Sequence, residues 1–302
     1  DSDEQRASAA ERETLLKVHE AAAKWFREQL LSAAGARIRK YIADRGINDV
    51  TSEAQGLGFA PPGREGLKQT LLKQGFSQAT LVKAGLLVQR DDGQAIDRFR
   101  GRLMIPISRD TGSIIAFGGR ALEKDQQPKY LNSPETPIYS KSRTLYGLHL
   151  SKTAIRQSGF VVLVEGYLDL IAVHQAGFEN AVASLGTALT PAQVKLLARY
   201  AERVVVSYDG DAAGINASVK SLDLFLERDG ALKSWRLRDT GFGDAAPAAQ
   251  APDHDLKYLA YEGKLSGDKG SVALVDTGTW IGDSGKPMGI QAALADPRIR
   301  LR

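Results

Sequence analysis

The chain has 302 residues, of which 43% are hydrophobic and 25% are charged, and its formal net charge is +4. This composition is that of a globular protein with room for two domains, and no apolar run approaches the roughly 20 residues that span a bilayer, so no membrane partner is expected. The absence of cysteine excludes disulfides and cysteine-based zinc sites, and we expect a cytoplasmic protein with no zinc in this chain.

The amino-terminal part of the chain is expected to be helical. It begins at Asp1 with neither an initiator Met nor a signal peptide, so we expect a fragment excised from a longer protein. Apolar residues recur at helical spacing over residues 8–45, and a second helical piece, Ala36–Arg45, ends at Gly46. Residues 47–90 predict short helical stretches that alternate with turns.

A β pattern begins at Arg102. Residues 103–107 and 114–119 are largely apolar and flank the turn residues 109–112, which predicts a hairpin. Residues 121–147 predict a long polar loop, and loops of this length in compact domains are often functional.

From residue 160 onward, strand patterns and helix patterns alternate. Strands are expected at 160–165, 180–185, 203–208 and 231–237. Helices are expected at 167–176, 191–202 and 213–228, with Thr190 and Pro191 at the start of the second. This alternation predicts an α/β fold with a doubly wound, mostly parallel sheet. Residues 238–252 predict a flexible insertion, and the residues after 265 indicate no clear element.

Two acidic motifs stand where strands of this sheet should end. Glu165 follows one apolar run, and Asp209 and Asp211 follow another. Because ligands bind beyond the carboxyl ends of the strands in an open parallel sheet, we expect the three carboxylates to meet in one crevice. Such ligands favour Mg²⁺ (or Mn²⁺), and these ions serve phosphoryl or nucleotidyl transfer. A simple surface turn at Asp209 and Asp211 is the alternative.

Charge is unevenly distributed along the chain. Residues 97–143 hold nine Lys and Arg against five Asp and Glu, whereas residues 160–211 hold three against six. A basic segment beside an acidic one suits a polyanion held against a cation-binding centre. Arg98, Arg100 and Arg102 alternate on one expected strand face and predict a ridge that tracks a nucleic-acid backbone; a solvated strand edge is the alternative.

Several motifs of the chain resemble one family. The second half resembles the Toprim fold of bacterial DnaG-type primases at Glu-Gly-Tyr-Leu-Asp (165–169), Ala-Ser-Leu-Gly-Thr (183–187) and Tyr-Asp-Gly-Asp-Ala-Ala-Gly (208–214). Toprim domains also occur in topoisomerases and some nucleases, but the upstream motifs favour a primase. These motifs are similar to the first half of the primase polymerase domain and lie at 97–102, 106–107, 117–120, 128–136 and 141–148. The resemblance covers about residues 36–235.

The resemblance implies roles for particular residues. Glu165, Asp209 and Asp211 are implied to be the catalytic metal ligands. The residues implied to hold the nucleoside triphosphate or template phosphates are Arg120, Lys129, Lys141 and Arg143, and cations near a metal site do neutralise phosphate charge. The implied organisation is a mixed α+β basic subdomain at 1–150, a Toprim metal-binding subdomain at 151–265 and an unassigned segment at 266–302.

The third acidic motif of the family is altered in this chain. Asp253-His254-Asp255 keeps the spacing of Asp-Pro-Asp but lacks the central proline, so Asp253 and Asp255 are open candidates for further metal ligands. The usual zinc-binding domain of the family cannot be present in a chain without cysteine, and its helicase-docking domain is not recognisable.

The resemblance implies the catalytic core of a DNA primase, a DNA-directed RNA polymerase of the primosome. Such an enzyme makes short RNA primers on a single-stranded DNA template by Mg²⁺-dependent transfer from ribonucleoside triphosphates, and its product is an RNA–DNA hybrid. A replicative helicase is the expected partner, through a domain absent here. The alternatives are another Toprim enzyme, a nuclease or topoisomerase, and a catalytically impaired single-stranded DNA-binding module.

Overall fold

The computed structural model describes residues 2–123, 125–185, 189–201 and 203–207, followed by short strands at 236–239, 259–264, 271–274, 280–281 and 287–288. The chain divides into two compact units, Asp1–Lys141 and Ser142–Arg302. Among the described residues, no helix is both long enough and apolar enough to cross a membrane.

Helical segments open the first unit: α1 (Ser2–Leu31), the 3₁₀ helix η1 (Ala33–Gly35), α2 (Ala36–Asp44) and α3 (Asp49–Ala54). The predicted helical region 8–45 is confirmed apart from the 3₁₀ break. Gly46 follows α2 with a φ of +74°, a conformation that favours glycine and ends the helix. One face of α1 from Leu15 onward is fully buried, through Leu15, Val18, Ala22, Phe26 and Leu30.

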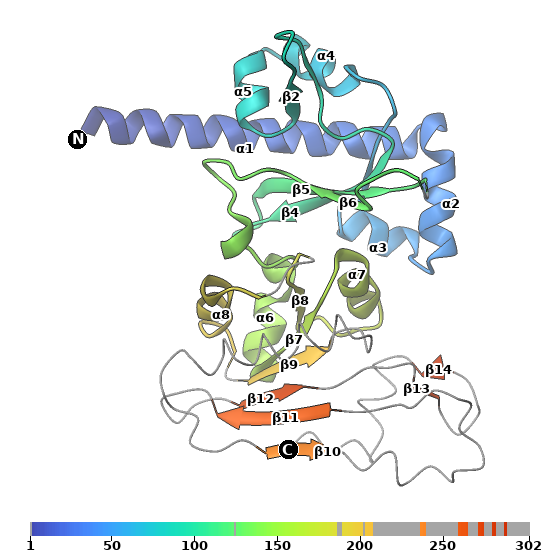
Figure 1. Ribbon diagram of the computed structural model, residues 1–302, viewed down its shortest axis with the longest axis vertical. Helices are drawn as coiled ribbons and strands as arrows, with labels where there is room; N and C mark the ends of the chain where they lie inside the picture. The colour runs from blue at the N-terminus through green and yellow to red at the C-terminus, as the bar shows by residue number, and fades with distance from the viewer. Residues whose placement is uncertain are drawn as a thin grey trace. The chain divides into compact units, whose positions relative to one another are not determined.

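An antiparallel sheet forms the centre of the first unit, in the order β1 (Gly58–Ala60), β4 (Arg102–Ser108), β5 (Ile114–Ala121) and β6 (Tyr130–Asn132). β4 and β5 confirm the predicted hairpin. α1 packs on this sheet (Figure 1), where the rings of Phe26 and Phe117 meet edge to face at 5.2 Å. A Cβ on Gly58 would come within 2.6 Å of Phe26 Cβ, so glycine allows the close approach of helix and strand.

The region 121–147 differs from the polar loop that was predicted. It contains β6 and the 3₁₀ helix η2 (Lys141–Arg143), and it buries Ile138, Tyr139 and Tyr146. The polar-loop prediction is therefore wrong for these parts. A three-residue strand is too short to show alternation, and the place of β6 is set by its pairing with β5, in which Leu131 lies opposite Gly119.

A smaller group of elements lies between β1 and β4 in the chain and contacts α1: α4 (Gly66–Lys73), α5 (Gln78–Lys83), β2 (Leu87–Gln89) and β3 (Ala95–Asp97). β2 and β3 pair as a hairpin. At the end of β3, the Asp97 carboxylate accepts hydrogen bonds from the backbone N–H groups of Leu67 and Lys68, both at 2.9 Å. A carboxylate is favourable at a helix N-terminus, so Asp97 ties α4 to the start of the basic segment.

A six-stranded sheet forms the centre of the second unit. The unit contains α6 (Leu148–Ser158), β7 (Phe160–Val164), α7 (Tyr167–Gln175), β8 (Ala181–Ala183), α8 (Pro191–Leu197), β9 (Arg203–Ser207), β10 (Arg236–Asp239), β11 (Leu259–Lys264) and β12 (Ser271–Leu274). The strand order is β10-β11-β12-β9-β7-β8, with β12, β9, β7 and β8 parallel and β10 and β11 antiparallel. β13 (Trp280–Ile281) and β14 (Pro287–Met288) form a separate pair.

The predicted α/β fold with a mostly parallel sheet is confirmed. From β7 the chain steps outward to β8 and then back past β7 to β9, which places α7 and α8 on opposite sides of β8 (Figure 1), as a doubly wound sheet requires. Apolar and β-branched side chains of the three strands form the core, among them Val161, Leu163, Val182, Val204 and Val206.

Most predicted elements of the second unit fall close to observed ones. Thr190 caps α8 by accepting a hydrogen bond from the Gln193 N–H at 3.2 Å, with Pro191 as the first helical residue, as predicted. The expected helix 213–228 lies outside the described residues. The expected strand 231–237 meets them only at β10, which is an antiparallel edge strand because it pairs with β11.

Candidate functional site

Glu165 lies at an edge where three parallel strands end together. Val164, the last residue of β7, is the register partner of both Ala183 of β8 and Ser207 of β9. Glu165 is half-buried and follows Val164 directly. This is the carboxyl edge of the sheet, where open α/β folds bind ligands.

The start of α7 shapes the backbone beside Glu165. The Asp169 carboxylate accepts a hydrogen bond from the Gly166 N–H at 3.0 Å and so caps the helix. A Cβ on Gly166 would lie 2.9 Å from this carboxylate oxygen, so glycine leaves room for the Asp169 side chain in this position. The N-terminal end of a helix carries partial positive charge, which suits negative charge at this edge.

Leu185 adds an unusual backbone conformation at the same edge. It follows β8 with a φ of +67° and is fully buried. A branched side chain rarely adopts this left-handed conformation, and such outliers concentrate at functional sites. Sequence reasoning missed this feature, although Leu185 lies within the Ala-Ser-Leu-Gly-Thr motif.

The other expected metal ligands, Asp209, Asp211, Asp253 and Asp255, lie outside the described residues. Asp209 is two residues beyond Ser207, a stretch of chain that spans at most about 7 Å. Within the described part of the chain, no three His, Asp or Glu side chains group in a way that could hold a metal ion. The structure thus positions Glu165, and the complete metal site stays a prediction.

Arg120, an expected phosphate ligand on β5, lies between two tyrosines. Its guanidinium carbon is 5.8 Å from the ring centre of Tyr41 and 5.0 Å from that of Tyr130. Arg120 Nε donates a hydrogen bond to the Tyr41 hydroxyl, and Nη1 donates one to the Tyr130 hydroxyl. Sequence analysis assigned no role to Tyr41, and nothing in its local pattern indicates this contact with a residue 79 positions away.

The prediction that Arg98, Arg100 and Arg102 share one strand face is wrong, whereas their predicted role in tracking a nucleic-acid backbone stays a prediction. Arg98 and Arg100 lie between β3 and β4, and only Arg102 belongs to a strand. Each guanidinium donates to a backbone carbonyl. Arg98 Nη2 donates to Asn132 O at 3.0 Å and Arg100 Nη1 donates to Asp97 O at 2.6 Å.

Arg102 is the most buried of the three, at 3% exposed. Its Nη1 donates to Gly119 O at 3.0 Å and to Pro128 O at 2.8 Å, and Nη2 reaches Gln127 O at 3.4 Å. Burial lowers its pKa, with a further contribution from nearby Arg100. The side chain therefore fastens β4 to the connection between β5 and β6.

The remaining expected phosphate ligands differ in exposure. Lys129 and Arg143 are exposed, whereas Lys141 is half-buried. Burial lowers the pKa of Lys141, and the charge of Glu135 opposes that shift. The Lys141 backbone N–H also donates to Glu135 Oε1 at 2.7 Å, which fixes the backbone of this segment.

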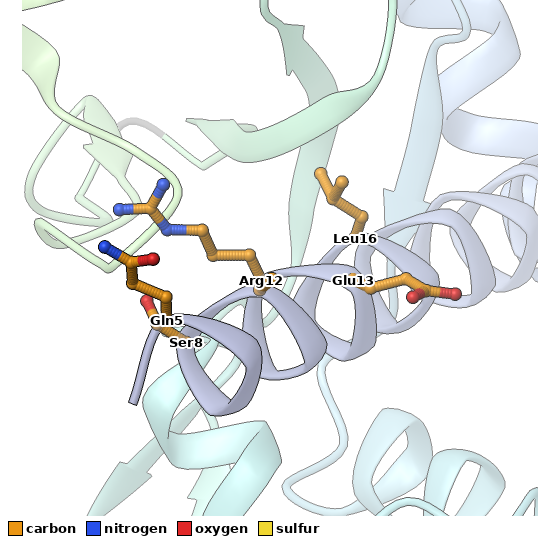
Figure 2. Close-up of a pocket in the computed structure, with 6 residues that line it drawn as sticks. Gln5, Ser8, Arg12, Glu13 and Leu16 are labelled. Carbon is orange, nitrogen blue, oxygen red and sulfur yellow. The ribbon is translucent and has the colours of Figure 1, made fainter. Parts of the chain in front are cut away.

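A surface hollow of about 530 Å³ lies along α1 and not at either group of expected residues (Figure 2). Its lining comes from one helix: Gln5, Ser8, Ala9, Arg12, Glu13 and Leu16. Groups that converge from several elements are typical of ligand sites. This single helical face lacks that feature, so we do not assign the site to it.

Comparisons with known proteins cover both halves of the chain. Residues 25–152 match the family described as the N-terminal domain of the DNA primase catalytic core, and residues 162–245 match a Toprim-like family. The DNA primase of Listeria innocua is 42% identical over 216 residues, which cover 71% of this chain and 34% of that protein. The chain thus spans about a third of the length of the first curated relatives that it matches.

Solved structures of DnaG primase domains are similar to this chain in both sequence and fold. The RNA polymerase domain of Mycobacterium tuberculosis primase DnaG is 36% identical, with a TM-score of 0.68 and coverage of 75% of each chain. A DnaG primase catalytic domain bound to single-stranded DNA is 38% identical, with a TM-score of 0.64 and coverage of 72% of this chain and 68% of that one.

Proposed function

The chain belongs to the DNA primase family, and from that premise we propose that it is a primase catalytic core, which synthesises RNA on a single-stranded DNA template from ribonucleoside triphosphates. The observation that carries the proposal is the position of Glu165 directly after β7, at the edge where β8 and β9 also end. The single-stranded DNA bound by the similar DnaG catalytic domain supports the choice of template.

In this proposal Glu165, Asp209 and Asp211 hold Mg²⁺ or Mn²⁺. Glu165 offers a hard oxygen ligand at a ligand-binding edge, and Asp209 follows the register partner of Val164 closely enough to reach the same edge. Bound divalent cations supply charge stabilisation for the attacking and leaving oxygens of nucleotidyl transfer. Asp253 and Asp255 stay candidates for further ligands.

The basic residues of the proposal bind phosphates. Arg120, Lys129, Lys141 and Arg143 neutralise phosphate charge on the template or nucleotide and orient the reacting groups. Arg98 and Arg100 stay open for this role, whereas the carbonyl contacts of Arg102 favour a structural one. An RNA–DNA hybrid product, a replicative helicase partner and a cytoplasmic location follow from the family resemblance.

The test is to incubate the chain with single-stranded DNA, Mg²⁺ or Mn²⁺ and labelled ribonucleotides. The proposal predicts short RNA products that disappear with Glu165→Gln and persist with Glu179→Gln, an exposed carboxylate outside the carboxyl edge. DNA cleavage without nucleotides would instead indicate another Toprim enzyme. DNA binding without any product would indicate a binding module.

A further inference from the structure

The environment of Arg120 points to a role for Tyr41. Arg120 is 8% exposed, and among the described residues no carboxylate pairs with it. A buried cation without a counter-charge is unfavourable unless other groups compensate it. Two neutral hydroxyls and two aromatic faces supply partial compensation, and an anionic ligand would supply the missing charge.

The guanidinium keeps donors free for such a ligand. It has five N–H groups, and the two tyrosines take one on Nε and one on Nη1. Within the described part of the chain, Nη2 has no hydrogen-bond partner. A guanidinium edge with unused donors matches the geometry of a phosphate group.

The two tyrosines are held in different ways. Tyr130 lies directly opposite Arg120 in the pairing of β5 with β6, so the sheet itself brings these two residues together. Tyr41 comes from α2, which is anchored by the buried side chains of Ile38 and Ile42. α2 is also linked to the end of β5 by two hydrogen bonds from Arg37 to the Glu123 carboxylate, at 2.5 and 3.2 Å.

The contact at Nε sets the rotation of the guanidinium plane. Because Tyr41 binds Nε from the helix while Tyr130 binds Nη1 from the sheet, the two hydroxyls together fix that plane and leave Nη2 unused. We propose that Tyr41 is a positioning residue that orients Arg120 toward a phosphate of the bound template strand or nucleotide. This inference rests on the proposed function, since that function supplies the phosphate.

The test compares Tyr41→Phe with Tyr200→Phe in the whole chain. Tyr200 is a matched control because its ring also stacks on an arginine, Arg156, at 5.0 Å, but in the other unit. Tyr41→Phe keeps the ring and removes one hydrogen bond to a charged group, so we expect affinity to fall by about five- to tenfold. The loss of affinity should raise either KM for ribonucleotides or Kd for a labelled single-stranded DNA, while kcat stays within about twofold. A rise in KM would assign Arg120 to a nucleotide phosphate, and a rise in Kd would assign it to a template phosphate.

Arg120→Lys provides the second arm. A lysine cannot use the Tyr41 hydroxyl to fix a planar edge, so adding Tyr41→Phe to Arg120→Lys should cause no further loss. Unchanged KM and Kd in Tyr41→Phe, an equal loss in Tyr200→Phe, or additive losses in the double variant would overturn the inference. So would failure of the unaltered chain to bind either probe. Binding that depends on Tyr41 in a chain that makes no RNA would overturn the proposed function alone.

Discussion

Arg102→Met should destabilise the first unit because it removes a buried donor. Arg102 is 3% exposed, and its guanidinium donates hydrogen bonds to the carbonyls of Gly119 and Pro128 at 3.0 and 2.8 Å. A weaker contact reaches Gln127 O at 3.4 Å. Leaving a buried carbonyl unsatisfied costs about 1–3 kcal/mol. Only the contact with Gly119 is fully buried, since Pro128 is exposed, so we expect a loss of about 1–3 kcal/mol in the free energy of unfolding, or a Tm lower by about 3–9 °C.

Urea unfolding followed by tryptophan fluorescence measures this loss, and Arg143→Met is the control. Arg143 is exposed, so its replacement should change stability by less than about 0.5 kcal/mol while it weakens binding to single-stranded DNA. For Arg102→Met, DNA affinity per folded molecule should stay unchanged. Full stability of Arg102→Met together with a loss of DNA affinity like that of Arg143→Met would refute the structural role and favour the phosphate ridge.

Two further predictions concern stability. Burial lowers the pKa of His19 from 6.5 to about 4, so the unfolded chain binds the proton first and stability falls as pH drops from 6.5 toward 4. Between pH 7.5 and pH 4.5 the free energy of unfolding should fall by about 2–3 kcal/mol through His19, and this fall should be missing in His19→Phe. The same pH dependence in the unaltered chain and in His19→Phe would contradict a neutral buried imidazole. Gly147 has a φ of +82°, and a Cβ there would lie 2.3 Å from Leu170 Cδ2. Gly147→Ala should therefore lower the stability by about 1–3 kcal/mol, whereas Gly159→Ala, with φ of +73° and open space around it, should lower it less; equal losses would remove steric contact as the cause.

The parts of the fold with a strong local pattern could be predicted from the sequence. The β4–β5 hairpin has a clear turn signal, and β7 and β9 each contain an apolar run rich in valine, of the kind found in buried parallel strands. β6 could not be predicted because three residues show no period, and its position depends on pairing with β5. The same limit applies to β1.

The candidate site shows a similar division. Glu165 could be placed because the end of a parallel strand is a position that the sequence pattern itself defines. The role of Arg102 could not be predicted, because an alternating arginine pattern is the same for an exposed ridge and for side chains that bind backbone carbonyls. The contact of Tyr41 with Arg120 and the left-handed backbone of Leu185 both depend on tertiary structure.

Binding of Mn²⁺, followed by electron paramagnetic resonance, tests the metal centre most directly because it needs no catalysis. Glu165→Gln and Asp209→Asn should each weaken Mn²⁺ binding by at least about tenfold, because each removes one charged oxygen ligand. Glu179→Gln should bind Mn²⁺ as the unaltered chain does. Unchanged Mn²⁺ affinity in Asp209→Asn would contradict the account, because the ends of β7 and β9 would then not share a metal site.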